Sequence, residues 1–170
     1  MNAEGSAADV IEGLWVGVVG QGETVRGLRH AVGEPVHAYL LVGPEGSGKR
    51  AAATAFAAEL LTADLDGPEA DRAAALAASG NHPDLHVVQR TGPSISAGTA
   101  REIVKDASRS PTEGRRQVFV LDEFHLVADA APILLKAIEE PEPATVFVVL
   151  AEEVTDPLVT IASRCVRFDL

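Results

Sequence analysis

The chain has 170 residues, about the size of one domain, with 46% hydrophobic residues and a formal net charge of −11. These values favour a folded domain and argue against a general polyanion-binding surface, because affinity for nucleic acid comes largely from lysine and arginine. The single cysteine, Cys165, excludes an internal disulfide and a cysteine-cluster zinc site. No apolar run approaches the ~20 residues of a membrane span, and the amino terminus lacks signal-peptide features, so we expect a cytoplasmic location.

Short apolar runs alternate with helix-like segments along the chain. Such apolar runs favour strands that are buried on both faces, as in a parallel sheet with helices on either side. We therefore predict a doubly wound α/β domain, a three-layer sandwich around a five-stranded, mostly parallel sheet. In chain order we expect a flexible lead (1–17), a helix (23–32), a turn (33–35), a strand (38–42), a helix (49–61), a loop and helix (62–80), a strand (84–89), a turn (90–94), a helix (97–108), a strand (117–121), a helix (129–139), a strand (144–150), a helix (157–162) and a strand (165–169).

A glycine-rich loop connects the first of these strands to the following helix. Its glycines can adopt positive φ values that turn successive backbone N–H groups toward an anion, and its lysine supplies a point charge for the outer phosphates. The amino-terminal end of the next helix adds a further positive potential. A turn without a ligand is the alternative, but the flanking strand and helix favour a phosphate-binding loop made of Gly43, Pro44, Glu45, Gly46, Ser47, Gly48 and Lys49.

The residue that follows the lysine is unusual for such a loop. This position normally carries a serine or threonine whose hydroxyl coordinates magnesium, and here it is Arg50. Arginine has five donors and no acceptor, so it cannot ligate a cation. Phosphate binding can survive this change, whereas metal-assisted hydrolysis loses a ligand.

Two carboxylates, Asp122 and Glu123, directly follow the predicted strand Gln117–Leu121. In an open parallel sheet, ligands bind at the carboxyl ends of the strands, so both residues are expected near the glycine-rich loop. Asp122 there could hold magnesium, and Glu123 could polarise the attacking water. An acidic loop that opens a helix is the alternative, and the neighbouring loop favours the functional interpretation.

Several segments, found in the same order along the chain, make it resemble the bacterial DNA polymerase III clamp-loader subunits, a group within the AAA+ ATPases. The resemblance spans almost the whole chain and implies an AAA+ nucleotide-binding domain over residues 18–170. It also implies ATP or ADP as the nucleotide, with Val18 and Val19 near adenine and magnesium on Asp122. The segments that carry the resemblance are Val18–Gln21, His37–Leu40, the glycine-rich loop, Asp122-Glu123, Leu134–Pro141 and Thr160–Cys165.

Within that family the chain is most similar to the delta-prime type of subunit, through Gly80–His86 and Ser110–Arg115. Delta-prime subunits commonly carry degenerate nucleotide loops, and Arg50 is a change of that kind. The threonine that usually senses phosphate after the fourth strand is replaced by Glu152-Glu153, whose charge would repel a γ-phosphate. Because the zinc-binding cysteines of many relatives are missing, we interpret His82 and His86 as loop or strand residues and expect no zinc.

The segment Thr160–Cys165 resembles the serine-arginine-cysteine motif of these subunits. The resemblance implies that Arg164 acts in trans as an arginine finger on the γ-phosphate of a neighbouring subunit. A weak surface salt bridge is the alternative role for this arginine. Cys165 is interpreted as a small buried apolar residue.

Three basic residues spaced by four, Arg101, Lys105 and Arg109, lie on one side of the helix predicted over 97–108. A solvated helix face is the usual outcome for such a pattern. In related loaders the corresponding helix faces the duplex, which makes these residues candidates for DNA contact.

The resemblance implies two functions, and an interaction-only role that needs no nucleotide is a third alternative. One is a non-hydrolysing delta-prime-like subunit that helps load the sliding clamp onto primed DNA, with gamma/tau and delta subunits as partners and no membrane association. The other is a working ATPase, such as the gamma/tau motor subunit or another AAA+ protein. Family members continue into lid and collar domains for which no residues remain after Leu170, so we expect the chain to be a fragment.

Overall fold

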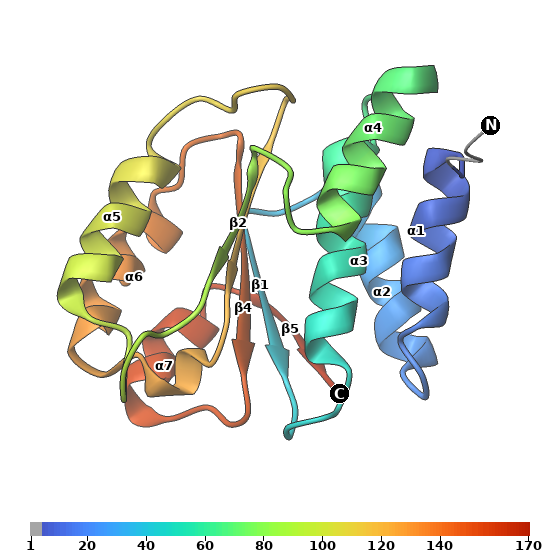
Figure 1. Ribbon diagram of the computed structural model, residues 1–170. Coiled ribbons are helices and arrows are strands. Elements are labelled where there is room, and N and C mark those ends of the chain that lie inside the picture. The colour runs from blue at the N-terminus through green and yellow to red at the C-terminus, as the bar shows by residue number, and fades with distance from the viewer. Residues whose placement is uncertain (1–4) are drawn as a thin grey trace.

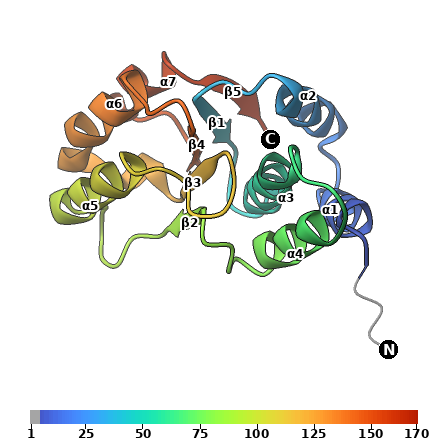
Figure 2. The ribbon, with the colours of Figure 1, turned by 90° about the horizontal axis from the view of Figure 1, so that it is seen from above.

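The computed structural model describes residues 5–170 as three layers with a sheet in the middle (Figure 1). Helices α1 to α4 cover one face of the sheet, and α5 to α7 cover the other, as the view from above also shows (Figure 2). This architecture confirms the predicted α/β sandwich. No helix in the described part of the chain is both long and apolar enough to cross a membrane.

All five strands are parallel, in the order β2-β3-β4-β1-β5. The two strands that carry the predicted site residues at their ends, β1 and β3, therefore lie on either side of β4. Their register aligns Leu121 of β3 with Val149 of β4, and Leu41 of β1 with Leu150. The strands are β1 (Ala38–Val42), β2 (Leu85–Val88), β3 (Gln117–Leu121), β4 (Thr145–Ala151) and β5 (Val166–Asp169).

Alternate residues of the central strands enter two separate cores. Tyr39 and Leu41 of β1 pack against α1 to α4, whereas Ala38, Leu40 and Val42 pack against α5 to α7. Every residue of β1, β3 and β4 is buried, which is why these strands have no polar face in the sequence.

The helices begin and end within a few residues of the predicted positions. The largest difference lies before α6, where the residues around 129 form 3₁₀ turns and the α-helix starts at Ala131, followed by Pro132 in the first turn. The helices are α1 (Ala7–Val16), α2 (Gly22–Gly33), α3 (Lys49–Thr62), α4 (Gly67–Ala78), α5 (Ala97–Ala107), α6 (Ala131–Glu139) and α7 (Asp156–Ala162), with 3₁₀ turns η1 (Phe124–Leu126) and η2 (Ala128–Ala130).

The prediction of a flexible lead over residues 1–17 is wrong for α1; residues 1–4 lie outside the described part. Ser6 and Asp9 form a reciprocal capping box that starts this helix. Ile11 and Trp15, one turn apart, are buried against α3 and α4, and Trp15 donates a hydrogen bond through Nε1 to Glu59 Oε2 at 2.6 Å. The cap and the apolar spacing were both present in the sequence.

Candidate nucleotide-binding site

The glycine-rich loop joins β1 to α3 at the carboxyl edge of the sheet, at the bottom of Figure 1. Gly46 and Gly48 adopt left-handed conformations, with φ values of 79° and 93°. Gly43 is required for another reason, because a Cβ there would lie 2.6 Å from the carbonyl oxygen of Leu170 and 2.7 Å from Ser47 Oγ. The glycines therefore serve the loop geometry that the sequence predicted.

Lys49 begins α3 and is buried, with its side chain folded back across the loop. Its Nζ donates to the Pro44 carbonyl oxygen at 2.9 Å. Gln21 supports the loop from outside through a hydrogen bond from Nε2 to the Ser47 carbonyl, at 3.2 Å. The lysine charge, the helix terminus and the loop amides thus lie together, as phosphate binding requires.

The two valines expected near adenine differ in their environment. Val18 is buried, and its Cγ1 lies 3.9 Å from the point where a Cβ on Gly48 would sit. Val19 is 82% exposed. Only Val18 therefore lies against the loop in this structure.

Arg50 forms an ion pair with Asp122, with 2.5 Å between Nε and Oδ2. The Asp122 side chain is 3% exposed, whereas that of Arg50 is 64% exposed. The Asp122 Oδ1 atom also accepts a hydrogen bond from the Glu123 N–H at 2.8 Å. The guanidinium therefore compensates a carboxylate that is buried at the end of β3.

Glu123 is held by a second arginine, Arg90. The Nε and Nη2 atoms of Arg90 donate to the two carboxylate oxygens, at 3.0 and 3.3 Å. Glu123 adopts a left-handed backbone conformation with φ of 50°, in contrast to the usual preference of non-glycine residues. Both carboxylates predicted as a catalytic pair are thus engaged by arginines. The contact of Arg90 with Glu123 could not be predicted from the sequence, because the two residues are 33 positions apart.

A hollow of about 400 Å³ lies between the loop and these carboxylates. Glu152, the first residue after β4, contributes to its wall, and both Glu152 and Glu153 are exposed. The Nδ1 atom of His125 accepts a hydrogen bond from the Glu152 N–H at 3.3 Å. The lining consists of Glu45, Gly46, Gly48, Lys49, Arg50, Ala51, Asp122, Glu123, His125 and Glu152.

The residues of this hollow do not fit a magnesium ion. The position that would supply a hydroxyl ligand carries Arg50, and its guanidinium is paired with Asp122, the carboxylate expected to hold the metal. Across residues 5–170, no group of three or more histidine, cysteine, aspartate or glutamate side chains is arranged to hold a metal ion.

Arg164 follows α7 and is paired within its own chain. Its Nε lies 2.5 Å from Glu139 Oε1, and its Nη1 donates to the Thr160 carbonyl at 2.8 Å. Burial raises the pKa of the neighbouring Cys165 thiol to about 12, and its Sγ donates to the Ile161 carbonyl. Glu139 was not identified from the sequence, because only the tertiary structure brings the end of α6 to this turn.

The basic residues proposed for DNA contact do not all lie on one helix. Arg101 and Lys105 are exposed on α5, but the helix ends at Ala107 and Arg109 lies beyond its cap. Arg109 pairs with Asp106 at 3.0 Å. Of the three basic residues, Arg101 and Lys105 therefore lie on α5, and Arg109 lies one residue beyond its C-cap.

The two segments that resembled the delta-prime type meet in space. The buried carboxylate of Asp84 accepts hydrogen bonds from the backbone N–H groups of Thr112, Glu113 and Gly114. His82 is buried in the turn before β2, and its Nδ1 accepts a hydrogen bond from the Asp84 N–H at 3.1 Å. His86 lies in β2 and stacks on Phe119, with ring centroids 4.4 Å apart. Both histidines are thus loop or strand residues, as interpreted from the sequence.

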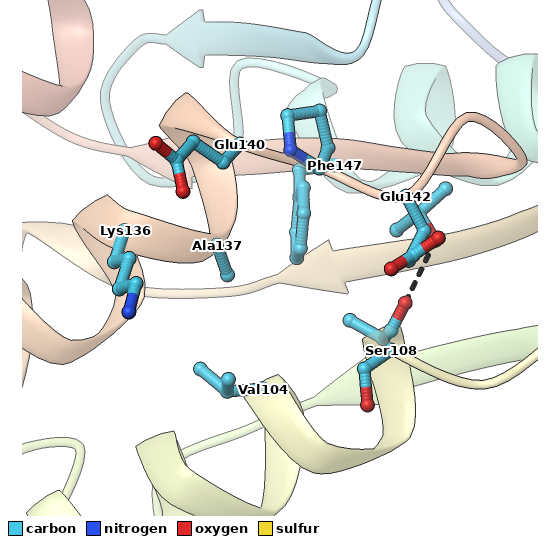
Figure 3. Close-up of a pocket in the computed structure, with 10 residues that line it drawn as sticks. Val104, Ser108, Lys136, Ala137, Glu140, Glu142 and Phe147 are labelled. Atoms are coloured by element: carbon cyan, nitrogen blue, oxygen red, sulfur yellow. Dashed lines mark hydrogen bonds between the residues drawn. The ribbon is translucent and has the colours of Figure 1, made fainter.

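A smaller hollow of about 170 Å³ lies between α5 and α6, at the opposite edge of the sheet (Figure 3). Val104 of α5, Ala137 of α6 and Phe147 of β4 are among the residues that line it. No residue of the glycine-rich loop lines this smaller hollow.

The fold and loop define this protein as a P-loop α/β domain of the AAA+ class. Comparison with known proteins gives the family: the model for "DNA polymerase III, delta subunit" matches residues 21–170, so the chain belongs to that family. It is 36% identical over 132 residues to the delta-prime subunit of Bacillus subtilis, covering 76% of this chain and 40% of that protein. The Pseudomonas aeruginosa delta-prime subunit is 36% identical over 137 residues, covering 77% of this chain and 42% of that protein.

Other similar proteins include the DNA polymerase III tau subunit of Bacillus subtilis, 32% identical over 158 residues, which are 89% of this chain and 28% of that protein. Among solved structures, a DNA polymerase III gamma subunit-related protein of Thermotoga maritima has a similar fold, with a TM-score of 0.67 at 19% identity, covering 86% of this chain and 45% of that chain. The chain thus spans about two fifths of the length of the delta-prime subunits it matches.

Proposed function

We propose that this chain is the nucleotide-binding domain of a delta-prime-like clamp-loader subunit, which helps load the sliding clamp onto primed DNA in the cytoplasm. The Arg50–Asp122 ion pair carries this proposal, because it occupies the carboxylate that a hydrolysing subunit would use for its metal. The loop, Lys49 and the start of α3 remain suited to the phosphates of ATP or ADP. The domain would thus bind nucleotide without turning it over.

A working ATPase, like a motor subunit, is the second candidate. The placement of Asp122 and Glu123 at the end of β3 supports it, since this is where a hydrolytic site would be built. Steady-state ATP turnover separates the two functions. We expect no magnesium-dependent turnover above background, and substantial turnover by the unmodified chain would favour the second candidate.

Arg164 is proposed to act on the nucleotide of a neighbouring gamma/tau subunit, within a complex that also contains delta. Its position in a turn after α7, about one third exposed, supports a contact across a subunit boundary. In a loader reconstituted with this chain as part of its full-length subunit, Arg164→Ala should lower DNA- and clamp-stimulated ATP turnover by about a hundredfold or more. Arg167→Ala, at another exposed arginine nearby, is the control. Equal turnover in both variants would contradict the proposal.

The exposed pair Arg101 and Lys105 is the remaining DNA-contact proposal. Two phosphate contacts support only part of the affinity for DNA, so reversing both charges should weaken DNA-stimulated loading and reduce its salt dependence. Loading with unchanged salt dependence would contradict this contact.

A further inference from the structure

The side chain of Arg50 places a permanent positive charge where the nucleotide site would need a cation. Its Nε is paired with Asp122, and its Nη1 and Nη2 groups form no hydrogen bond within residues 5–170. Because a guanidinium presents donors in a planar fork, the remaining N–H groups can bind phosphate oxygens while Nε stays on the carboxylate.

A divalent ion would have to compete with this arrangement. Asp122 is almost completely buried, so it needs a compensating charge in every state of the protein, and Arg50 already supplies one. An ion approaching Asp122 would have to displace the guanidinium, and it would also be repelled by Lys49 in the same hollow. The arginine supplies no electron pair to a metal in return.

The charges around the hollow also favour a short phosphate chain. Within residues 5–170, Lys49 is bound only to a backbone carbonyl, so no carboxylate there cancels its charge. Glu152 lies on the same wall as a negative group without an ion-pair partner among the described residues. Two phosphates would therefore contact the loop amides, the ammonium group of Lys49 and the Nη1 and Nη2 groups of Arg50, whereas a third phosphate would approach the carboxylate of Glu152.

We infer that this site binds the diphosphate group of a nucleotide without a divalent cation, and that Arg50 provides the charge that a metal ion supplies elsewhere. The inference rests on the proposed nucleotide-binding function of the same loop and adds its metal requirement. It assigns to Arg50 a direct role in ligand binding.

Calorimetric titration with ADP, once in excess EDTA and once in excess magnesium, tests the inference. We expect the two dissociation constants to agree within about threefold. Arg50→Thr, which restores a hydroxyl, should weaken ADP binding in EDTA by about tenfold or more and make it depend on magnesium. Arg72→Thr, at an exposed arginine on α4 whose partner is Glu113, is the control and should bind ADP as the unmodified chain does.

The possible outcomes test the metal-free binding separately from the proposed nucleotide binding by the glycine-rich loop. Binding of ADP only in magnesium would overturn the metal-free site and leave nucleotide binding intact. No binding under either condition would overturn both. Binding of ADP in EDTA by Arg50→Thr as tight as by the unmodified chain, with an unchanged thermal unfolding midpoint, would overturn the role of Arg50 and leave nucleotide binding intact.

Discussion

Asp84 holds the backbone of Glu113: its Oδ2 accepts the Glu113 N–H at 2.9 Å, and the N–H groups of Thr112 and Gly114 bind the same carboxylate. The two chain segments that this contact joins are far apart in the sequence. The buried carboxylate therefore fixes the loop that leads into β3, the strand that carries Asp122. This contact links a structural motif to the geometry of the nucleotide site.

The first prediction concerns Asp84→Asn. Burial by itself would raise the pKa of Asp84, but the three backbone hydrogen bonds outweigh it and hold the pKa below its ordinary value. Asparagine has one acceptor oxygen and would direct an NH₂ group at backbone N–H donors. We expect the free energy of unfolding at neutral pH to fall by about 2–4 kcal/mol, measured by urea denaturation.

The difference in the free energy of unfolding between the unmodified chain and Asp84→Asn should depend on pH. A carboxylate whose pKa is lower in the folded state stabilises the protein above its unfolded-state pKa, and this stabilisation is lost as the pH falls through the folded-state pKa. The difference between the unmodified chain and Asp84→Asn should therefore shrink in acid. Asp66→Asn, at an exposed residue whose side chain makes no capping hydrogen bond, should show little difference at any pH. A constant gap for Asp84→Asn would contradict the titration of this carboxylate.

The second prediction concerns α1. Trp15 is 3% exposed and packs against α3, so Trp15→Ala should lower the free energy of unfolding by about 3–5 kcal/mol. Because Trp15 is the only tryptophan, the unfolding should be followed by circular dichroism. Val16→Ala, at the 70% exposed neighbour, is the control. Equal free energies of unfolding for the two variants would show that Trp15 does not anchor α1, in agreement with the flexible segment predicted from the sequence.

The third prediction concerns Glu139→Gln. Glu139 binds Arg164 within the chain, and the γ-phosphate of a partner would have to compete with it. Removing the negative charge should raise the affinity of the subunit for its ATP-bound partner by about two- to fivefold. The dissociation constant can be measured by surface plasmon resonance. Glu140→Gln, at the adjacent exposed glutamate, should leave the affinity unchanged. Weaker binding after Glu139→Gln would instead show that Glu139 holds Arg164 in its working position.

The fourth prediction concerns Cys165. Because burial raises the pKa of its thiol to about 12, very little thiolate is present at neutral pH. Alkylation by iodoacetamide should be slower in the native chain than in urea by about a hundredfold or more, and the single cysteine makes the measurement unambiguous. Similar rates in both conditions would show that Cys165 is accessible and ordinary in acidity.

The elements were predictable where one local pattern was sufficient. The apolar runs of β1 and β3 coincide with the expected ranges, because strands buried on both faces have no polar residues to obscure them. The glycine-rich loop was equally clear. Boundaries such as the end of α5 were less so, since caps and 3₁₀ turns depend on a few local hydrogen bonds.

The sequence by itself determined the sheet, the phosphate loop and the replacement of a hydroxyl by Arg50. Only the tertiary structure decided the partners of the charged residues: Arg50 with Asp122, Arg90 with Glu123, and Arg164 with Glu139. The reason is that an apolar pattern involves residues that are adjacent in the sequence. An ion pair, in contrast, forms between residues that are distant in the sequence and that the strand order brings together. The parallel order places the ends of β1 and β3 on either side of β4, and that placement puts the arginine on the carboxylate.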